Sequence, residues 1–162
     1  MKRVLFVCLG NICRSPVAEG IFMHKVRERG LESRLTGDSA GTAGYHIGEP
    51  PHTTSSSVAR EYGVALNHRA RQFQQADFER FDHILCMDRS NYETVRRLAG
   101  TTHLQSKVGM IGQFLSGPVP APVEGAPEIP DPYYGPVAGF HDVHQLLDTA
   151  TSNLITHLTS AS

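Results

Sequence analysis

Residues 8–15 of the chain read Cys8-Leu9-Gly10-Asn11-Ile12-Cys13-Arg14-Ser15. The preceding residues 3–7 are mostly apolar and β-branched, a pattern that predicts a buried strand. Pro16 follows the stretch directly and is typical of the first turn of a helix, where a missing backbone N–H removes no hydrogen bond. The expected order is therefore strand, tight loop and helix, with a thiol at the start of the loop and a guanidinium at its end.

The rest of the chain alternates between patterns of strands and helices. Strands are expected at 35–39, 81–87 and 108–114, and helices at 15–29, 53–62, 89–99 and 140–158. The Thr and Ser run 53–57 is expected to cap the second helix and Asp88 the third. This alternation predicts an α/β fold in a single domain, residues 1–162, with a four-stranded parallel sheet and helices on both faces. Ligands of such sheets lie beyond the carboxyl ends of the strands, where Cys8 and Asp88 are expected.

Composition excludes several classes of partner. Apolar residues make up 40% and charged residues 19% of the 162 residues, which is ordinary for a globular protein. The formal net charge of −1 leaves no electrostatic basis for binding nucleic acid or an anionic membrane. No apolar run approaches the ~20 residues that a membrane span requires. We therefore expect no nucleic-acid partner and no membrane span.

The N-terminus and the cysteines bear on location. Met1-Lys2-Arg3 and the apolar run after them imitate a signal peptide, but the run ends after about seven residues without a small-residue cleavage site. The three cysteines cannot all pair within one chain, which favours a reducing compartment and thiol chemistry. A cytoplasmic location is expected, and secretion without a cleavable signal stays open.

A proline-rich segment precedes the last helix. Residues 116–136 hold seven of the ten prolines, and a structureless stretch of this length in a small domain is usually functional or disordered. Its last part has a chemically specific sequence, Asp131-Pro132-Tyr133-Tyr134-Gly135.

The loop after the first strand has the composition of an oxyanion site. Backbone N–H groups that curl around one centre, followed by a helix N-terminus, attract a phosphate group. Gly10 and Asn11 tolerate the backbone conformations that such a curl needs. Arg14 can place its guanidinium fork on two phosphate oxygens, and the same positive field favours the thiolate of Cys8. Residues 8–15 are therefore predicted to form a phosphate-binding loop with a nucleophile beneath the phosphorus.

A thiolate that attacks phosphorus needs a proton donor for the leaving oxygen. Asp131 is the candidate, as an acid on a loop that can close over the site and then activate water. Ser15 Oγ can hydrogen-bond Cys8 and stabilise the departing thiolate. This chemistry uses no metal and no cofactor, and a zinc site at Cys8 and Cys13 is disfavoured because no second Cys/His pair has suitable spacing.

The cysteines also have a purely structural interpretation. Cys8 and Cys13 can be packing thiols, as free cysteines often are, and Cys86 is expected in the core. An isolated Cys-x5-Arg pair is a weak signal. A preceding strand and a following Ser-Pro and helix make it a strong one.

With these residues the chain resembles the low-molecular-weight protein tyrosine phosphatases, bacterial-type members among them, over nearly its whole length. Five of the family's motifs occur in the expected order, at residues 7–19, 38–42, 67–72, 82–88 and 131–135. The resemblance implies that Cys8 is the nucleophile, Arg14 the phosphate clamp and Asp131 the general acid and base.

The resemblance also assigns the surroundings of these groups. Asn11, Ser39 and His68 would hold the loop in its strained shape. An aromatic rim for the substrate ring is expected from Tyr45, Tyr133 and Tyr134, and the family allows phosphorylation of the paired tyrosines. A protective Cys8–Cys13 disulfide is a hypothesis. The residues expected to line the substrate site within the loop are Leu9, Gly10, Asn11, Ile12, Cys13 and Ser15.

The implied partners are phosphotyrosine proteins, with a bacterial tyrosine kinase as one candidate, and phosphate or other oxyanions. Three other functions stay open. An arsenate reductase of this fold needs a pair of resolving cysteines near the third strand, where Cys86 stands alone. Phosphoarginine phosphatases carry threonine in place of Ile12. A non-catalytic phosphotyrosine-binding module is expected to lack Cys8, Arg14 or Asp131.

Overall fold

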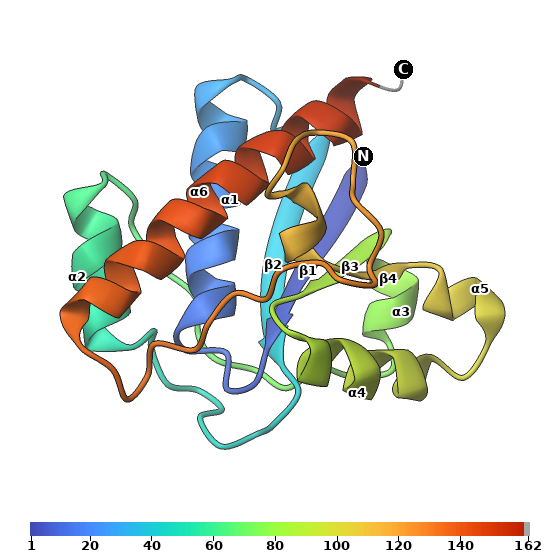
Figure 1. Cartoon of the computed structure of the whole chain (residues 1–162), viewed down its shortest axis with the longest axis horizontal. Helices are drawn as coiled ribbons and strands as arrows, with labels where there is room; N and C mark the ends of the chain where they lie inside the picture. Colours follow the sequence, from blue (N-terminus) through green and yellow to red (C-terminus); the bar gives the residue numbers. More distant parts are fainter. Residues whose placement is uncertain (161–162) are drawn as a thin grey trace.

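A parallel sheet with the strand order β2-β1-β3-β4 forms the centre of the molecule (Figure 1). The computed structural model describes residues 1–160, and α1 and α6 cover one face of the sheet while α3 and α4 cover the other. The predicted α/β fold with four parallel strands and helices on both faces is confirmed. The elements are β1 (Lys2–Cys8), α1 (Arg14–Glu28), β2 (Leu35–Gly41), α2 (Thr53–Glu61), α3 (Asp77–Arg80), β3 (His83–Cys86), α4 (Arg89–Ala99), α5 (Thr102–Gln105), β4 (Val108–Met110), the 3-10 helix η1 (Ile111–Phe114) and α6 (Val137–Ser160).

Strand β1 contributes to two separate hydrophobic clusters because successive side chains of a strand point to opposite faces. Val4, Phe6 and Cys8 belong to the cluster beneath α1 and α6, and Leu5 and Val7 belong to the cluster beneath α3 and α4. Both neighbours of β1 are parallel strands, so its backbone is paired on both edges. Cys8, the last residue of the strand, therefore lies on the α1 side, where the following loop turns into the helix.

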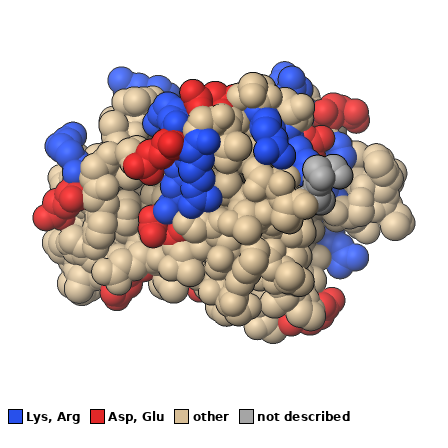
Figure 2. All heavy atoms as spheres, turned by 90° about the horizontal axis from the view of Figure 1, so that it is seen from above, with Lys and Arg blue, Asp and Glu red and all other residues tan. Residues whose placement is uncertain are grey.

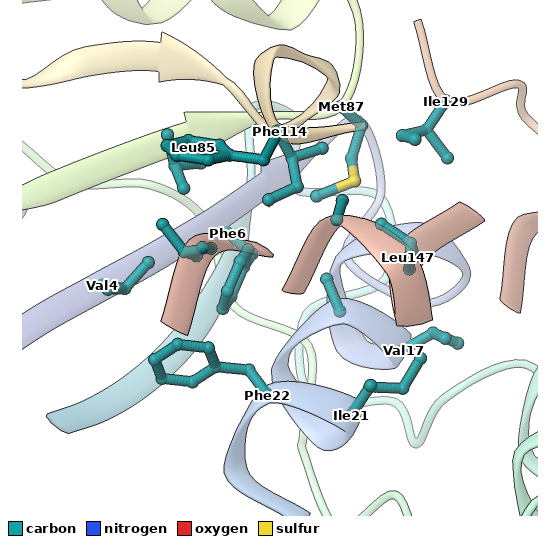
Figure 3. Packing of buried hydrophobic residues seen from close by; sticks show 14 of the residues in the cluster. Val4, Phe6, Val17, Ile21, Phe22, Leu85, Met87, Phe114, Ile129 and Leu147 are labelled. Atoms are coloured by element: carbon teal, nitrogen blue, oxygen red, sulfur yellow. The ribbon is translucent and has the colours of Figure 1, made fainter. Parts of the chain in front are cut away.

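The larger cluster joins the sheet to the two long helices. The rings of Phe6 and Phe22 meet edge to face, with 5.4 Å between their centroids. In Figure 3, side chains of α1 lie on one side of Phe6 and side chains of β3 and η1 on the other. The residues labelled there are Val4, Phe6, Val17, Ile21, Phe22, Leu85, Met87, Phe114, Ile129 and Leu147. This packing fixes α1, and with it the end of the loop that follows β1.

Some predicted boundaries are wrong. The fourth strand ends at Met110 instead of residue 114, because the Gln113 side chain accepts the Met110 N–H at 2.8 Å and the chain turns into η1. The third strand is shorter than 81–87, and β2 runs on to Gly41. The Thr and Ser run 53–57 lies inside α2, whose N-cap is His52. Residues 116–136 contain no helix or strand, and α6 begins at Val137, three residues before the expected start.

The surface carries charges of both signs. Basic and acidic side chains lie next to one another on the face in Figure 2 and do not gather into a field of one sign. Within residues 1–160, no helix combines the length and the apolar character that a membrane span requires.

The packing of α6 against Tyr62 buries a titratable side chain. The rings of Tyr62 and His144 stack with 4.1 Å between centroids, His144 is 3% exposed, and its Nδ1 has no hydrogen-bond partner among the described residues. Burial lowers the pKa of His144 below its ordinary value of 6.5, against the opposing effect of Asp148.

We predict that the free energy of unfolding falls as the pH drops below 6.5. In the unfolded chain this histidine then binds a proton, whereas the buried imidazole of native His144 stays neutral because its pKa is lowered. The contribution is fully present above 6.5 and is lost as the pH falls towards the lowered native pKa. Urea unfolding at about pH 7.5 and about pH 5.5 measures it. His144→Phe keeps the stacked ring but cannot titrate, so its free energy of unfolding should vary less between the two pH values. An equal pH dependence in both proteins would exclude this role for His144.

Candidate active site

The loop between β1 and α1 closes around the sulfur of Cys8. Asn11 donates its backbone N–H to Cys8 Sγ at 3.3 Å, and the Ser15 hydroxyl lies 3.0 Å from the same sulfur. Cys8 is 2% exposed, and its contact with Ser15 places its sulfur beside the first turn of α1, whose N-terminus is a region of positive potential. The Asn11 N–H and the helix N-terminus therefore direct positive potential at the sulfur on the floor of the loop.

Arg14, the first residue of α1, carries a buried guanidinium. Its Nη1 donates to Asp88 Oδ2 at 2.7 Å and to the Ile129 carbonyl at 3.0 Å, and its Nη2 lies 3.7 Å from Asp131 Oδ2. Burial alone would lower the pKa of Arg14, but Cys8, Asp88 and Asp131 raise it above its ordinary value. The guanidinium is therefore a fixed positive charge between the end of β3 and the loop that carries Asp131.

Asn11 holds the shape of the loop. It is the one non-glycine residue among 1–160 with a positive φ, 59°, and it is 1% exposed. Its Nδ2 donates to Ser15 Oγ at 2.8 Å and to Ser39 Oγ at 3.0 Å. Its Oδ1 accepts from His68 Nε2 at 2.7 Å and from the Arg71 backbone N–H at 2.9 Å. Four hydrogen bonds thus fix one amide in a backbone conformation that most residues avoid.

A second layer of charged groups supports these contacts. The Ser39 hydroxyl donates to Glu19 Oε1 at 2.7 Å, and His68 Nδ1 lies 3.1 Å from the same carboxylate oxygen. Arg71 bonds Asp77, which is fully buried, through both terminal nitrogens at 3.1 Å. The segment around Arg71 is therefore anchored on the side away from the loop.

The mouth of the loop is a cavity of about 330 Å³. Tyr133 is 36% exposed and Tyr134 97% exposed, so both form an outer rim, together with Tyr45. Of the predicted site residues, Asn11, Ser15, Ser39 and His68 lie beneath the cavity in the hydrogen-bonded layer. The cavity is lined by Cys8, Leu9, Gly10, Ile12, Cys13, Arg14, Tyr45, His46, Asp131, Tyr133 and Tyr134.

Asp131 reaches the cavity from the proline-rich segment. Its side chain is 45% exposed, and its Oδ1 accepts the backbone N–H of Tyr133 at 3.1 Å. Facing both the open mouth and Arg14, the carboxyl group can exchange protons with a molecule bound in the cavity.

The other two cysteines differ from Cys8 in their surroundings. Burial raises the pKa of the Cys13 thiol to about 12, and it also raises the pKa of the fully buried Cys86. Both are therefore neutral thiols. The Cys8–Cys13 disulfide stays a prediction.

One group of possible metal ligands lies near the site. Glu19, Asp38 and His68 place ligand-type atoms within 4.8 Å of one another. His68 Nε2 donates to Asn11, and its Nδ1 faces both carboxylates. These three groups are therefore already partnered by one another and by Asn11.

Several contributors were not singled out from the sequence. Asp88 is predicted as a helix cap, which it is, and at the ligand-facing edge after the third strand, but the sequence analysis assigns it no role toward Arg14. Glu19, Asp38 and Arg71 lie within the quoted motifs without an assigned role. No sequence pattern singles out His46 or His52, because each contacts Tyr133 from a distant part of the chain.

Comparisons with known proteins agree with this geometry. The sequence model of the family "Low molecular weight phosphotyrosine protein phosphatase" matches residues 3–162. A Streptomyces coelicolor protein named low molecular weight protein-tyrosine-phosphatase is 40% identical over 94% of this chain and 91% of its own length.

Solved structures are similar along the whole chain. A protein tyrosine phosphatase from Entamoeba histolytica, described with Hepes in its active site, has a TM-score of 0.89, 34% identity and coverage of 99% of this chain and 98% of its own. DARP, a Drosophila arginine phosphatase, has a TM-score of 0.87 and 31% identity, with full coverage of both chains.

We predict that Asn11→Gly and Asn11→Ala both destabilise the protein by about 2 kcal/mol or more, because partly buried donors at His68 and Arg71 lose their acceptor. Asn11→Ala should be less stable than Asn11→Gly by about 0.5–1 kcal/mol, since only alanine is strained at this φ while glycine raises the entropy of the unfolded chain. Urea unfolding measures both differences, and titration with inorganic phosphate should show weaker binding in both variants. Equal stability of the two variants would mean that the left-handed conformation imposes no constraint.

Proposed function

Since the chain belongs to the low molecular weight phosphotyrosine protein phosphatase family and is a protein-tyrosine-phosphatase, we propose that it hydrolyses phosphotyrosine in proteins through a cysteinyl-phosphate intermediate on Cys8. One observation carries the proposal: Cys8, Arg14 and Asp131 line a single cavity of about 330 Å³.

In the first step, Cys8 Sγ attacks the phosphorus. A P–S bond forms while the bond between phosphorus and the tyrosine oxygen breaks, and Asp131 gives its proton to that oxygen. Arg14 and the loop N–H groups stabilise the negative charge of the transferring phosphoryl group. Asp88, at 2.7 Å from Arg14, keeps the guanidinium in place.

In the second step, water attacks the phosphocysteine and Asp131, now a carboxylate, accepts a proton from it. The P–S bond breaks and the sulfur leaves as a thiolate, stabilised by the Ser15 hydroxyl and the Asn11 N–H. Inorganic phosphate is released. No step uses a metal ion or a cofactor.

The walls of the cavity favour an aryl ester. Ile12 is an apolar wall residue, Leu9 is 44% exposed at the mouth, and the tyrosine rim can stack on an aromatic ring. A tyrosine-phosphorylated protein, such as a bacterial tyrosine kinase, is the substrate class that fits.

The alternatives are less well supported. The name of the Drosophila relative raises phosphoarginine as a second substrate, but a guanidinium gains little from an apolar wall at Ile12. An arsenate reductase relay would need a reactive Cys86, and that thiol is fully buried with a raised pKa. A binding module without catalysis would not need all three of the reacting groups.

We predict that Cys8→Ser abolishes turnover of p-nitrophenyl phosphate, because a serine hydroxyl at this place is a far weaker nucleophile than a thiolate. The variant should still bind inorganic phosphate or vanadate, since Arg14 and the loop N–H groups remain. Steady-state kinetics and calorimetric titration measure the two properties. Retained activity would exclude the covalent mechanism, and activity lost on adding a chelator to the wild-type protein would contradict a metal-free site.

Asp131→Asn should lower the rate about 10²–10⁴-fold for esters with poor leaving groups, because the leaving oxygen then receives no proton. For p-nitrophenyl phosphate the loss should be much smaller, since nitrophenolate leaves without protonation. The measurement is kcat/KM over a series of aryl phosphates with leaving groups of increasing basicity. A uniform loss across the series would argue against a proton donor at Asp131.

A further inference from the structure

His52 lies where three parts of the site meet. Its backbone N–H donates to the carbonyl of Ile12 in the phosphate-binding loop at 2.8 Å. Its Nδ1 accepts the backbone N–H of Thr54 at 3.1 Å and so caps the N-terminus of α2. An acceptor at Nδ1 requires a lone pair there, so a neutral ring carries its hydrogen on Nε2. Two hydrogen bonds thus fix both the place and the orientation of the imidazole ring.

The imidazole is in turn a contact surface for two other segments. It stacks on Phe140 in the first turn of α6, with 5.1 Å between centroids and 27° between the planes. It meets the ring of Tyr133 edge to face at 5.4 Å and 68°. The other imidazole near Tyr133, that of His46, is more distant, at 6.3 Å. His52 is therefore the nearer of the two imidazoles that hold Tyr133.

The position of Tyr133 decides the position of Asp131. The chain is anchored at Ile129, whose N–H donates to the Met87 carbonyl at 2.8 Å, and regular structure resumes only at Val137. Between these points Asp131 lies on a segment without helix or strand, and its Oδ1 accepts the backbone N–H of Tyr133 at 3.1 Å. Whatever holds the Tyr133 ring therefore also holds this carboxylate.

We propose that His52 is a positioning residue for the proton transfer. Its ring holds Tyr133 and, through Tyr133, the carboxyl group of Asp131. Because the backbone of His52 is bonded to the phosphate-binding loop, this carboxyl group keeps a fixed position relative to the loop. The inference rests on the proposed function, in which Asp131 protonates the leaving oxygen. Proton transfer depends steeply on geometry, and a displacement of about 1 Å can lower a rate about 10²-fold. His52 touches no reacting atom and acts only through its neighbours.

Two substitutions separate the ring of His52 from its cap. His52→Asn keeps a side-chain acceptor for the Thr54 N–H, because asparagine is among the best N-cap residues, but removes the aromatic contacts. His52→Phe keeps an aromatic ring beside Tyr133 and Phe140 but removes the acceptor. Both keep the backbone N–H that bonds Ile12.

The experiment compares kcat/KM for phenyl phosphate and p-nitrophenyl phosphate, because kcat/KM covers the steps up to loss of the alcohol. His52→Asn should lose about 10-fold more activity on phenyl phosphate than on p-nitrophenyl phosphate. His52→Phe should keep the wild-type ratio of the two esters and show instead a lower midpoint of thermal unfolding. The inhibition constant of inorganic phosphate should be unchanged in both variants, since the loop itself is intact.

Asp131→Asn, measured beside them, distinguishes the two levels of inference. If Asp131→Asn loses more kcat/KM on phenyl phosphate than on p-nitrophenyl phosphate and His52→Asn loses equally on both, the positioning role of His52 is overturned while the proposed function stands. If Asp131→Asn itself loses kcat/KM equally on both esters, the proposed function is overturned, because Asp131 is then not the proton donor. Equal loss on both esters in His52→Asn, with weaker phosphate inhibition, would assign His52 to the support of the loop and overturn the proposal.

Discussion

The side-chain amide of Asn11 is the contact on which the site depends. A phosphate-binding loop must turn its N–H groups inward, and this one does so around a residue whose φ of 59° is unfavourable for most side chains. The strain is offset by four hydrogen bonds: the amide donates to Ser15 and Ser39 and accepts from His68 and Arg71. Those partners come from α1, β2 and the chain between α2 and α3, so the loop keeps its shape only when these parts are assembled. The geometry of a few residues is thus a property of the whole fold.

Charge balance is the second organising feature. A guanidinium as buried as that of Arg14 is tolerated because Asp88 and the Ile129 carbonyl bind one side of it and Asp131 lies near the other. Asp88 follows the end of β3, as expected for a ligand-facing residue of a parallel sheet, and the segment that carries Asp131 is brought there by the bond between the Ile129 N–H and the Met87 carbonyl. Arg14 therefore links the loop that carries Cys8 to the segment that carries Asp131, and the contact of His52 with Tyr133 is a second link between the same two segments.

The sequence was sufficient for the elements with regular patterns. The apolar run before Cys8, the helix after Arg14 and the Asp88 cap each follow from local chemistry, and all three are present. The predicted fourth strand is too long because residues 111–114 fit a 3-10 turn as well as a strand. The hydrogen bond from the Met110 N–H to the Gln113 side chain favours the turn. No local pattern marks His52 as a cap, because Thr and Ser are the common N-cap residues and a run of them follows it directly. Patterns along the chain point to the proposed reacting groups, whereas supporting groups such as Glu19 and Arg71 emerge only when distant segments are placed together.

The pairing of β1 on both edges has a further consequence. Local opening in proteins begins where the backbone lacks regular hydrogen bonds and ends with the central strands. Cys8 terminates the strand at the middle of the sheet, whereas Asp131 belongs to a stretch held mainly by side chains and isolated bonds. We therefore expect the backbone around Asp131 to open more readily than β1, so that a fluctuation of the proposed general acid leaves the strand that ends at Cys8 in place.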